Sequence, residues 1–144
     1  MACGTVNEAR GEASWFCCGA GWGPCGGAGG GACGNCNSGS HQCAWPNASS
    51  ACFNITRPDL CGENLARKGC GTGIYVAHWC SGACVFVTVA DCGPNTHQFC
   101  NEASCCTLNG QRLCVTNRDI DLTPSAYSLI ASLSTGLTPV AIGH

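Results

Sequence analysis

The chain has 144 residues, of which only 10% are charged, and its formal net charge is −2. The six basic residues are scattered along the chain, which argues against nucleic acid and against an anionic membrane surface as partners. Its length predicts one domain over residues 1–144, and no apolar run is long enough to cross a membrane.

The first half of the sequence predicts little regular structure. Residues 11–18 are rich in aromatic side chains and predict a short strand. Residues 19–40 are glycine-rich and predict a flexible or cross-linked surface loop; they are not a phosphate loop, because no Gly-Lys-Ser/Thr follows. Residues 41–72 are expected to be irregular and held by cysteines.

The pattern becomes regular after this point. Residues 73–79 predict a strand, and residues 84–90 predict a second strand that alternates in polarity. Val85, Val87 and Val89 would then share one face of the second strand. A turn at Ser81-Gly82 would join the two strands as a hairpin.

The last third of the chain predicts one helix between short strands. Residues 92–110 are expected to form a polar, disulfide-rich insertion, and residues 112–115 another short strand. Thr123 is a good N-cap with Pro124 at the first helical position, and Gly136 is a natural end. The apolar residues between them follow helical spacing: Ala126, Leu129, Ile130, Leu133. A final strand is predicted over residues 138–142.

Cysteine accounts for 17 of the 144 residues, a density that predicts a disulfide framework. Each cross-link typically stabilises a protein by about 2–4 kcal/mol, because it restricts the unfolded chain. The odd count leaves at least one cysteine unpaired or paired outside the monomer. We expect this to be Cys3, which lies near a terminus, although the sequence does not determine the pairing.

Zinc binding is the alternative use of these cysteines. Cys33 and Cys36 have the spacing of a zinc knuckle, with His41 and Cys43 close behind. No second pair completes a clean four-ligand set, and adjacent cysteines such as Cys17-Cys18 are more typical of secreted scaffolds. The sequence therefore predicts no metal and no other cofactor.

A secretory route is also indicated by two glycosylation triplets, at residues 47–49 and 54–56, which predict a glycoprotein. Residues 1–3 have neither the basic nor the apolar region of a signal peptide. We therefore expect a mature secreted domain to which a start methionine was added.

Asp91 and Asp121 each follow an apolar run, and in a chain with so little charge they are the first candidates for a functional site. Both have a structural alternative. Asp91 could make an Asx turn at the start of Asp-Cys-Gly-Pro. Asp121 could support the N-terminus of the predicted helix, where an anion is favourable.

Four segments carry a family resemblance. Residues 87–94 read as a strand that ends in an Asp-x-x-Pro turn, and residues 120–127 contain an Asp-Leu-Ser/Thr helix start. Residues 136–140 supply a glycine and a closing strand, and residues 11–16 fit Gly-x-Ala-Ser/Thr-aromatic-aromatic. Together they resemble the double-psi β-barrel of expansins, rare lipoprotein A domains and family-45 endoglucanases.

This resemblance implies a mainly β fold: a six-stranded double-psi β-barrel with one clear helix and long disulfide-stapled loops. Residues 19–70 and 95–115 lie outside the resemblance and would be largely loop insertions. In this family the two aspartates face one open groove that takes a glycan chain.

The resemblance also implies what the aspartates would do. Cleavage of a glycosidic bond needs a protonated carboxylic acid beside the leaving oxygen. A carboxyl in a partly apolar site near a second carboxylate has a raised pKa and can hold that proton. Asp121, between Ile120 and Leu122, is the better candidate for the acid, and Asp91 would tune it or bind sugar hydroxyls.

Two departures from the hydrolase pattern bear on the reaction. The catalytic base of family-45 endoglucanases would fall at Cys17, and the histidine usually found two residues before the acid is replaced by Asp119. Expansins lack the base, and on their pattern Ser14 lines the groove opposite the aspartates. Lytic transglycosylases of this barrel type need a single acid, which Asp91 matches.

Four tryptophans, Trp15, Trp22, Trp45 and Trp79, could stack on sugar rings. Trp22 and Trp45 are predicted in polar loops and are the better candidates, whereas Trp15 and Trp79 lie in strand patterns where burial competes. His78 alternates with apolar neighbours, which favours a packed or hydrogen-bonded histidine over a catalyst.

These observations lead to three functional hypotheses. The first is a secreted, monomeric, expansin-like domain that binds or modifies cell-wall polysaccharide, such as cellulose, another β-glucan or peptidoglycan, with Asp91 and Asp121 in the groove. The second is a glycan-cleaving enzyme, an endo-β-1,4-glucanase-like hydrolase or a lytic transglycosylase, with Asp121 or Asp91 as the acid. The third is a barwin-like defence protein or protease inhibitor.

Overall fold

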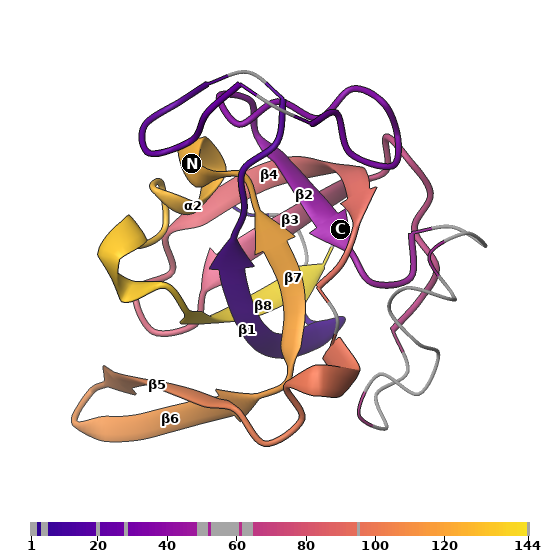
Figure 1. Ribbon diagram of the computed structural model, residues 1–144. Coiled ribbons are helices and arrows are strands. Elements are labelled where there is room, and N and C mark those ends of the chain that lie inside the picture. Colours follow the sequence, from indigo (N-terminus) through magenta and orange to yellow (C-terminus); the bar gives the residue numbers. More distant parts are fainter. Residues whose placement is uncertain are drawn as a thin grey trace.

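The computed structural model describes residues 3, 6–19, 21–27, 29–48, 52, 61, 65–94 and 96–143. Six strands of this part close into a barrel, shown in Figure 1. Around the barrel their order is β1 (Ala9–Trp15), β7 (Arg118–Leu122), β2 (Gln42–Trp45), β4 (Cys84–Cys92), β3 (Gly73–His78) and β8 (Thr138–Gly143).

The barrel is mixed. β1 runs parallel to β7 and β2 runs parallel to β4, while the other four contacts between neighbouring strands are antiparallel. Segments far apart in the sequence therefore lie side by side, because a parallel pair needs a long crossover between its strands. The ends of β1 and β7, more than a hundred residues apart, become neighbours in this way.

The barrel interior is filled by branched aliphatic side chains from all around the wall. The predicted alternation along β4 is confirmed: Val85, Val87 and Val89 are buried in the core, whereas Phe86 is 43% exposed. The predicted hairpin between β3 and β4 is also confirmed by their antiparallel pairing. These two strands were readable because each has one face in the core and one face outside it.

The prediction that residues 41–72 are irregular is wrong for β2, which lies in the middle of the barrel wall between β7 and β4. All four of its residues are buried, so the strand has no alternation between polar and apolar side chains. The polar Gln42 side chain can be buried because its amide is hydrogen-bonded to the neighbouring loop. It donates to the Asn35 carbonyl at 3.1 Å and accepts from Asn37 N at 2.7 Å.

The predicted helix is shorter than its apolar spacing indicates. Helix α2 covers only Pro124–Tyr127, and a 3₁₀ turn follows at Leu133–Thr135. Leu129, expected on the buried face, is 52% exposed. Thr123 precedes the helix as predicted but makes no side-chain cap, because its hydroxyl donates to the carbonyls of Ser40 (2.5 Å) and Gln42 (3.1 Å).

A separate two-stranded hairpin, β5 (Ala103–Leu108) and β6 (Gln111–Thr116), lies below the barrel in Figure 1. The 3₁₀ turn η3 (Thr96–Gln98) precedes it. The expected insertion thus contains a regular strand, and the short strand expected at residues 112–115 is confirmed within β6. The hairpin turns at Asn109-Gly110, both with positive φ, as Asn-Gly turns between strands favour.

Sixteen of the seventeen cysteines form eight disulfides, which confirms the predicted framework and indicates an oxidising compartment. The expectation that Cys3 is the odd cysteine is wrong: Cys3 pairs with Cys84, and the free cysteine is Cys43, buried in β2. Cys33 and Cys36, the knuckle pair, bond to other partners, Cys70 and Cys18.

The glycine-rich loop is cross-linked, which is one of the two forms expected for it. The disulfides of Cys17, Cys18 and Cys33 each tie a part of it to the rest of the chain or to itself. The glycosylation triplet at residues 54–56 lies outside the described residues, as does Ser49 of the other. Within the described part of the chain, no helix is long and apolar enough to cross a membrane.

Candidate functional site

Ser14, Asp121, Ala44 and Asp91 occupy one row across four neighbouring strands, which we call the aspartate row. Ser14 on β1 is paired with Asp121 on β7, Asp121 with Ala44 on β2, and Ala44 with Asp91 on β4. Residues paired across strands project to the same side of a sheet. Asp91 and Asp121 are therefore two strands apart, with Cα atoms roughly 10 Å from each other by ordinary strand spacing.

The row lies on the outer side of the wall. Ile120 and Leu122, on either side of Asp121, are both in the barrel core, so the intervening carboxylate projects away from it. Ala44 follows the buried core residue Cys43 in the same way. Asp121 is partly exposed.

An irregularity in β4 gives Asp91 its orientation. The pairing between β2 and β4 shifts between Cys43 and Ala44, whose partners are Val89 and Asp91, so that Ala90 is left over. Without this bulge, Asp91 would follow Val89 into the core. An extra residue that re-aims a side chain is a common use of β-bulges beside functional sites.

The Asp121 carboxyl accepts a hydrogen bond from the Ser14 hydroxyl. Burial raises the pKa of Asp121 above its usual range, and the negative charge of Asp91 adds to the rise. The Ser14 hydrogen bond and the positive charge of Arg118 act in the opposite direction. Asp121 is thus a carboxyl whose proton affinity is set by identifiable neighbours, as expected of a group that holds or exchanges a proton.

Arg118 was not foreseen as part of this site. It lies three residues before Asp121 on β7, and the only signal in the sequence was this proximity. Gly93, in the turn after β4, was also not foreseen. A Cβ there would lie 3.7 Å from Asp121 Oδ2 and 3.8 Å from Ala44 Cβ, so the buried turn at this glycine lies directly against the row.

Asp91 holds the glycine-rich loop as well as facing the row. Its Oδ1 accepts hydrogen bonds from Ala32 N and from Cys92 N, both at 2.8 Å. Gly31 packs directly on this strand, because a Cβ there would lie 2.5 Å from the Ala90 carbonyl oxygen. Asp91 therefore has a structural role beside any chemical role, but it is not the expected Asx turn, because Gly93 N donates to the Trp45 carbonyl at 3.4 Å.

The tryptophans divide differently from the sequence prediction. Trp45 is not in a polar loop: it ends β2, is fully buried, and donates from its indole nitrogen to the Ala66 carbonyl at 2.9 Å. Its ring is therefore closed to a sugar. Trp15 ends β1, packs against the core and donates to the Leu133 carbonyl at 3.0 Å. Trp22, with its ring against Gly39, is a partly exposed loop tryptophan. Trp79, expected within a strand, lies in the turn after β3 and is also partly exposed, with the Arg10 guanidinium 5.2 Å from its ring centroid.

Three other residues weighed in the sequence have defined environments. Cys17, at the position of the hydrolase base, is bonded to Cys25 and carries no free thiol. Asp119 is fully buried beside Gly11. His78 Nδ1 accepts hydrogen bonds from the amides of Cys80 (3.2 Å) and Ser81 (3.1 Å), which confirms the prediction of a hydrogen-bonded histidine.

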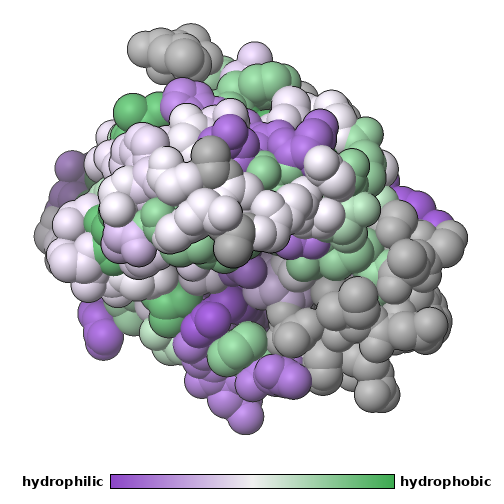
Figure 2. All heavy atoms as spheres, turned by 45° about the horizontal axis from the view of Figure 1, so that its top comes forward, coloured by the Kyte–Doolittle hydropathy of each residue, from purple (hydrophilic) through white to green (hydrophobic). Residues whose placement is uncertain are grey.

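The loop face of the molecule is turned forward in Figure 2, where hydrophilic, intermediate and hydrophobic residues are mixed without one broad apolar area among the coloured atoms. No protein-family model matches the sequence, and a search of curated proteins found no match. The candidate site therefore stands on its geometry alone.

Proposed function

We propose that this chain is a secreted domain of the double-psi β-barrel class that binds a cell-wall polysaccharide along the aspartate row. Carboxylate and hydroxyl groups suit this ligand, because they exchange hydrogen bonds with sugar hydroxyls. The ligand classes are those of the resemblance: cellulose, another β-glucan or peptidoglycan.

The observation that carries this proposal is the aspartate row itself. Two aspartates from sequence segments thirty residues apart, and a serine from the opposite end of the chain, occupy adjacent register positions on one side of one wall. The closed mixed barrel with two parallel strand pairs supports the same class. Trp22, partly exposed in the glycine-rich loop, is the tryptophan best suited to stack on a sugar ring.

Binding or loosening is favoured over two-carboxylate hydrolysis by the disulfide of Cys17. An inverting hydrolase needs a second carboxylate to activate water. A cystine sulfur at that position cannot accept the proton from water. The proposed activity is therefore expansin-like, without cleavage of the polymer.

The second candidate is cleavage by a single acid, as in lytic transglycosylases. The resemblance matches their acid to Asp91, whereas the environment in the structure favours Asp121. Burial and the charge of Asp91 both raise the pKa of Asp121, which favours the protonated form that an acid catalyst needs. In this mechanism Asp121 would donate its proton to the glycosidic oxygen while a hydroxyl of the substrate attacks. The first candidate needs no proton transfer.

One assay separates the two candidates. The protein is incubated with cellulose, mixed-linkage glucan, xylan, chitin and peptidoglycan, and both polymer pull-down and release of reducing ends or anhydro-muropeptides are measured. Asp121→Asn and Asp91→Asn test the row. Glu8→Gln is a control outside it that keeps an oxygen acceptor for Lys68, to which Glu8 now binds at 2.8 Å.

We expect the protein to be pulled down by a polymer without releasing products. The affinity for that polymer should fall at least about tenfold in the two row variants but not in the control, which corresponds to a loss of 1.4 kcal/mol in binding free energy. Release that disappears in Asp121→Asn would favour the single-acid enzyme instead. Neither binding nor release on any polymer would exclude both and leave the defence or inhibitor class.

A further inference from the structure

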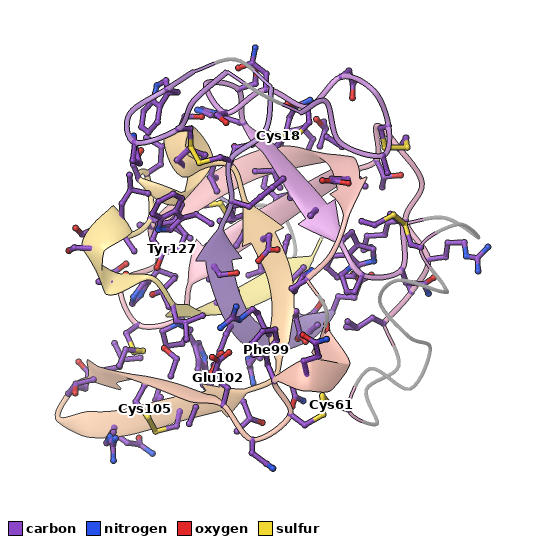
Figure 3. All side chains as sticks on the ribbon, viewed as in Figure 1. Cys18, Cys61, Phe99, Glu102, Cys105 and Tyr127 are labelled. Carbon is purple, nitrogen blue, oxygen red and sulfur yellow. A yellow bond between two sulfur atoms is a disulfide. The ribbon has the colours of Figure 1, made fainter. Side chains whose placement is uncertain are left out.

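A second carboxyl cluster lies where the β5–β6 hairpin joins the barrel. Arg118, at the start of β7, binds Glu102 through two parallel contacts, Nε to Oε1 at 3.0 Å and Nη2 to Oε2 at 2.6 Å. The guanidinium also stacks over the Phe99 ring, 3.8 Å from its centroid. Figure 3 shows Phe99 and Glu102 together at the lower edge of the barrel, above the hairpin.

Glu12 completes this cluster from β1. It is the cross-strand partner of Arg118, its side chain is fully buried, and no hydrogen-bond donor reaches either carboxylate oxygen. A buried, unsolvated carboxylate beside a second carboxylate is strongly disfavoured in its charged form. The single guanidinium available is already engaged by Glu102.

We propose that Glu12, Glu102 and Arg118 form a proton-dependent latch that holds the β5–β6 hairpin against the barrel while Glu12 is protonated. The neutral Glu12 carboxyl donates its proton toward the Glu102 carboxylate, which in turn accepts from Arg118. Loss of that proton to solvent places two carboxylates against one guanidinium, and the hairpin side of the cluster loosens. Water then enters the cluster and solvates the charged Glu12 carboxylate.

The protonation behaviour of the two carboxyls agrees with this arrangement. Burial, together with the neighbouring Glu102, raises the pKa of Glu12 to about 8. The hydrogen bonds from Arg118 and Glu12 lower the pKa of Glu102, against the effect of its own burial. One proton on Glu12 and none on Glu102 is thus the resting state at neutral pH.

Other charges around Glu12 do not provide compensation among the described residues. β8 pairs with Glu12 at Pro139 and has no titratable side chain within Thr138–Gly143. β6 contributes one charged residue, Arg112, which is exposed. Asp119 on β7 is a further buried carboxyl and supplies no positive charge.

The pH window follows from the direction of the shift. When the hairpin opens, Glu12 regains an ordinary pKa near 4.5, whereas it is about 8 in the closed state. Between these values the open state releases a proton that the closed state keeps, so opening becomes roughly tenfold more favourable per pH unit. The rise stops near pH 8, where both states are charged. Glu102 titrates below this window and does not contribute within it.

The test combines two measurements on the disulfide-intact protein. Amide hydrogen exchange of residues 103–116, corrected for the intrinsic pH dependence of exchange, is followed from pH 5 to pH 8 in wild type, Glu12→Gln and Asp91→Asn. Carbon-13 NMR of the Glu12 carboxyl follows its protonation directly in wild type. Glu12→Gln keeps a neutral hydrogen-bond donor at every pH, and Asp91→Asn makes the same carboxyl-to-amide replacement outside the cluster.

We expect exchange of the hairpin amides to rise by at least a hundredfold over this range in wild type and Asp91→Asn, and to stay flat in Glu12→Gln. A Glu12 carboxyl that titrates near 4.5 would overturn the proposal, and this result does not depend on the variant folding. A raised Glu12 pKa with hairpin exchange that does not change with pH would also overturn it, because the proton would then be held without acting as a latch.

Discussion

Asp91 and Asp121 lie on either side of β2, and each is the cross-strand partner of Ala44. This relationship explains why one aspartate influences the other: the negative charge of Asp91 raises the pKa of Asp121. It also gives each a separate anchor, because Asp121 accepts from Ser14 and Asp91 accepts from Ala32 N.

Replacement of Ser14 by alanine should raise the pKa of Asp121, because the hydroxyl now favours the charged carboxylate. A hydrogen bond to a charged group is worth about 1.5–3 kcal/mol, so the rise should be resolved in a titration. A carbon-13 NMR titration of the Asp121 carboxyl measures it. Ser128→Ala, which removes an exposed hydroxyl bound to the Ser125 carbonyl, is the matched control and should leave the titration unchanged. An unchanged titration in Ser14→Ala would show that the hydroxyl does not stabilise the charged form.

Asp91→Asn should move the same titration the other way. The substitution removes the negative charge that raises the pKa of Asp121, while the asparagine oxygen can still accept from Ala32 N and Cys92 N. We expect the pKa of Asp121 to fall, by less than Ser14→Ala raises it, because the Asp91 charge is the smallest of the influences on it and is partly screened. A rise in the pKa of Asp121, or a loss of the folded signals, would contradict the expectation that asparagine removes the charge of Asp91 but keeps its hydrogen bonds to the loop.

The sequence predicted β3 and β4 because each strand alternates between the core and the outside. β8 is buried at every position and was expected instead from the glycine turn before it and from the family resemblance. β2 is also buried at every position and shows no period, and it was missed. Because β2 was not predicted, the sequence could not show that Asp91 and Asp121 share the cross-strand partner Ala44.

Three further features depend on information that a single sequence does not contain. The disulfide partners are set by the folded path of the chain, and the expected odd cysteine was wrong for that reason. The bulge at Ala90 changes which way Asp91 projects without any sign in the apolar pattern. Burial of Trp45 follows from β2 being a barrel strand, so its expected role in a polar loop could not be corrected without the fold.

Gly31→Ala should loosen the glycine-rich loop from Asp91. Gly31 has φ of +68°, and an added Cβ would meet the Ala90 carbonyl oxygen at 2.5 Å and Asp91 Cβ at 3.3 Å. We expect a loss of about 2 kcal/mol in the free energy of unfolding, from backbone strain and displacement of the loop. Denaturant unfolding with intact disulfides measures it. Gly26→Ala, where a Cβ would meet nothing within 4 Å and φ is not positive, should be nearly neutral; equal losses in both variants would show that the loop does not need this close approach.

The free thiol offers a direct check on the disulfide pattern. Cys43 lies fully buried in β2, and burial raises the pKa of its thiol, so the reactive thiolate is scarce as well as inaccessible. We expect an alkylating reagent to leave the native protein unmodified over hours and to add one label per chain in denaturant without reductant. Peptide mapping should place that label on Cys43. A label on Cys3, or rapid labelling of the native protein, would contradict the pairing of Cys3 with Cys84 and the position of β2 inside the barrel wall.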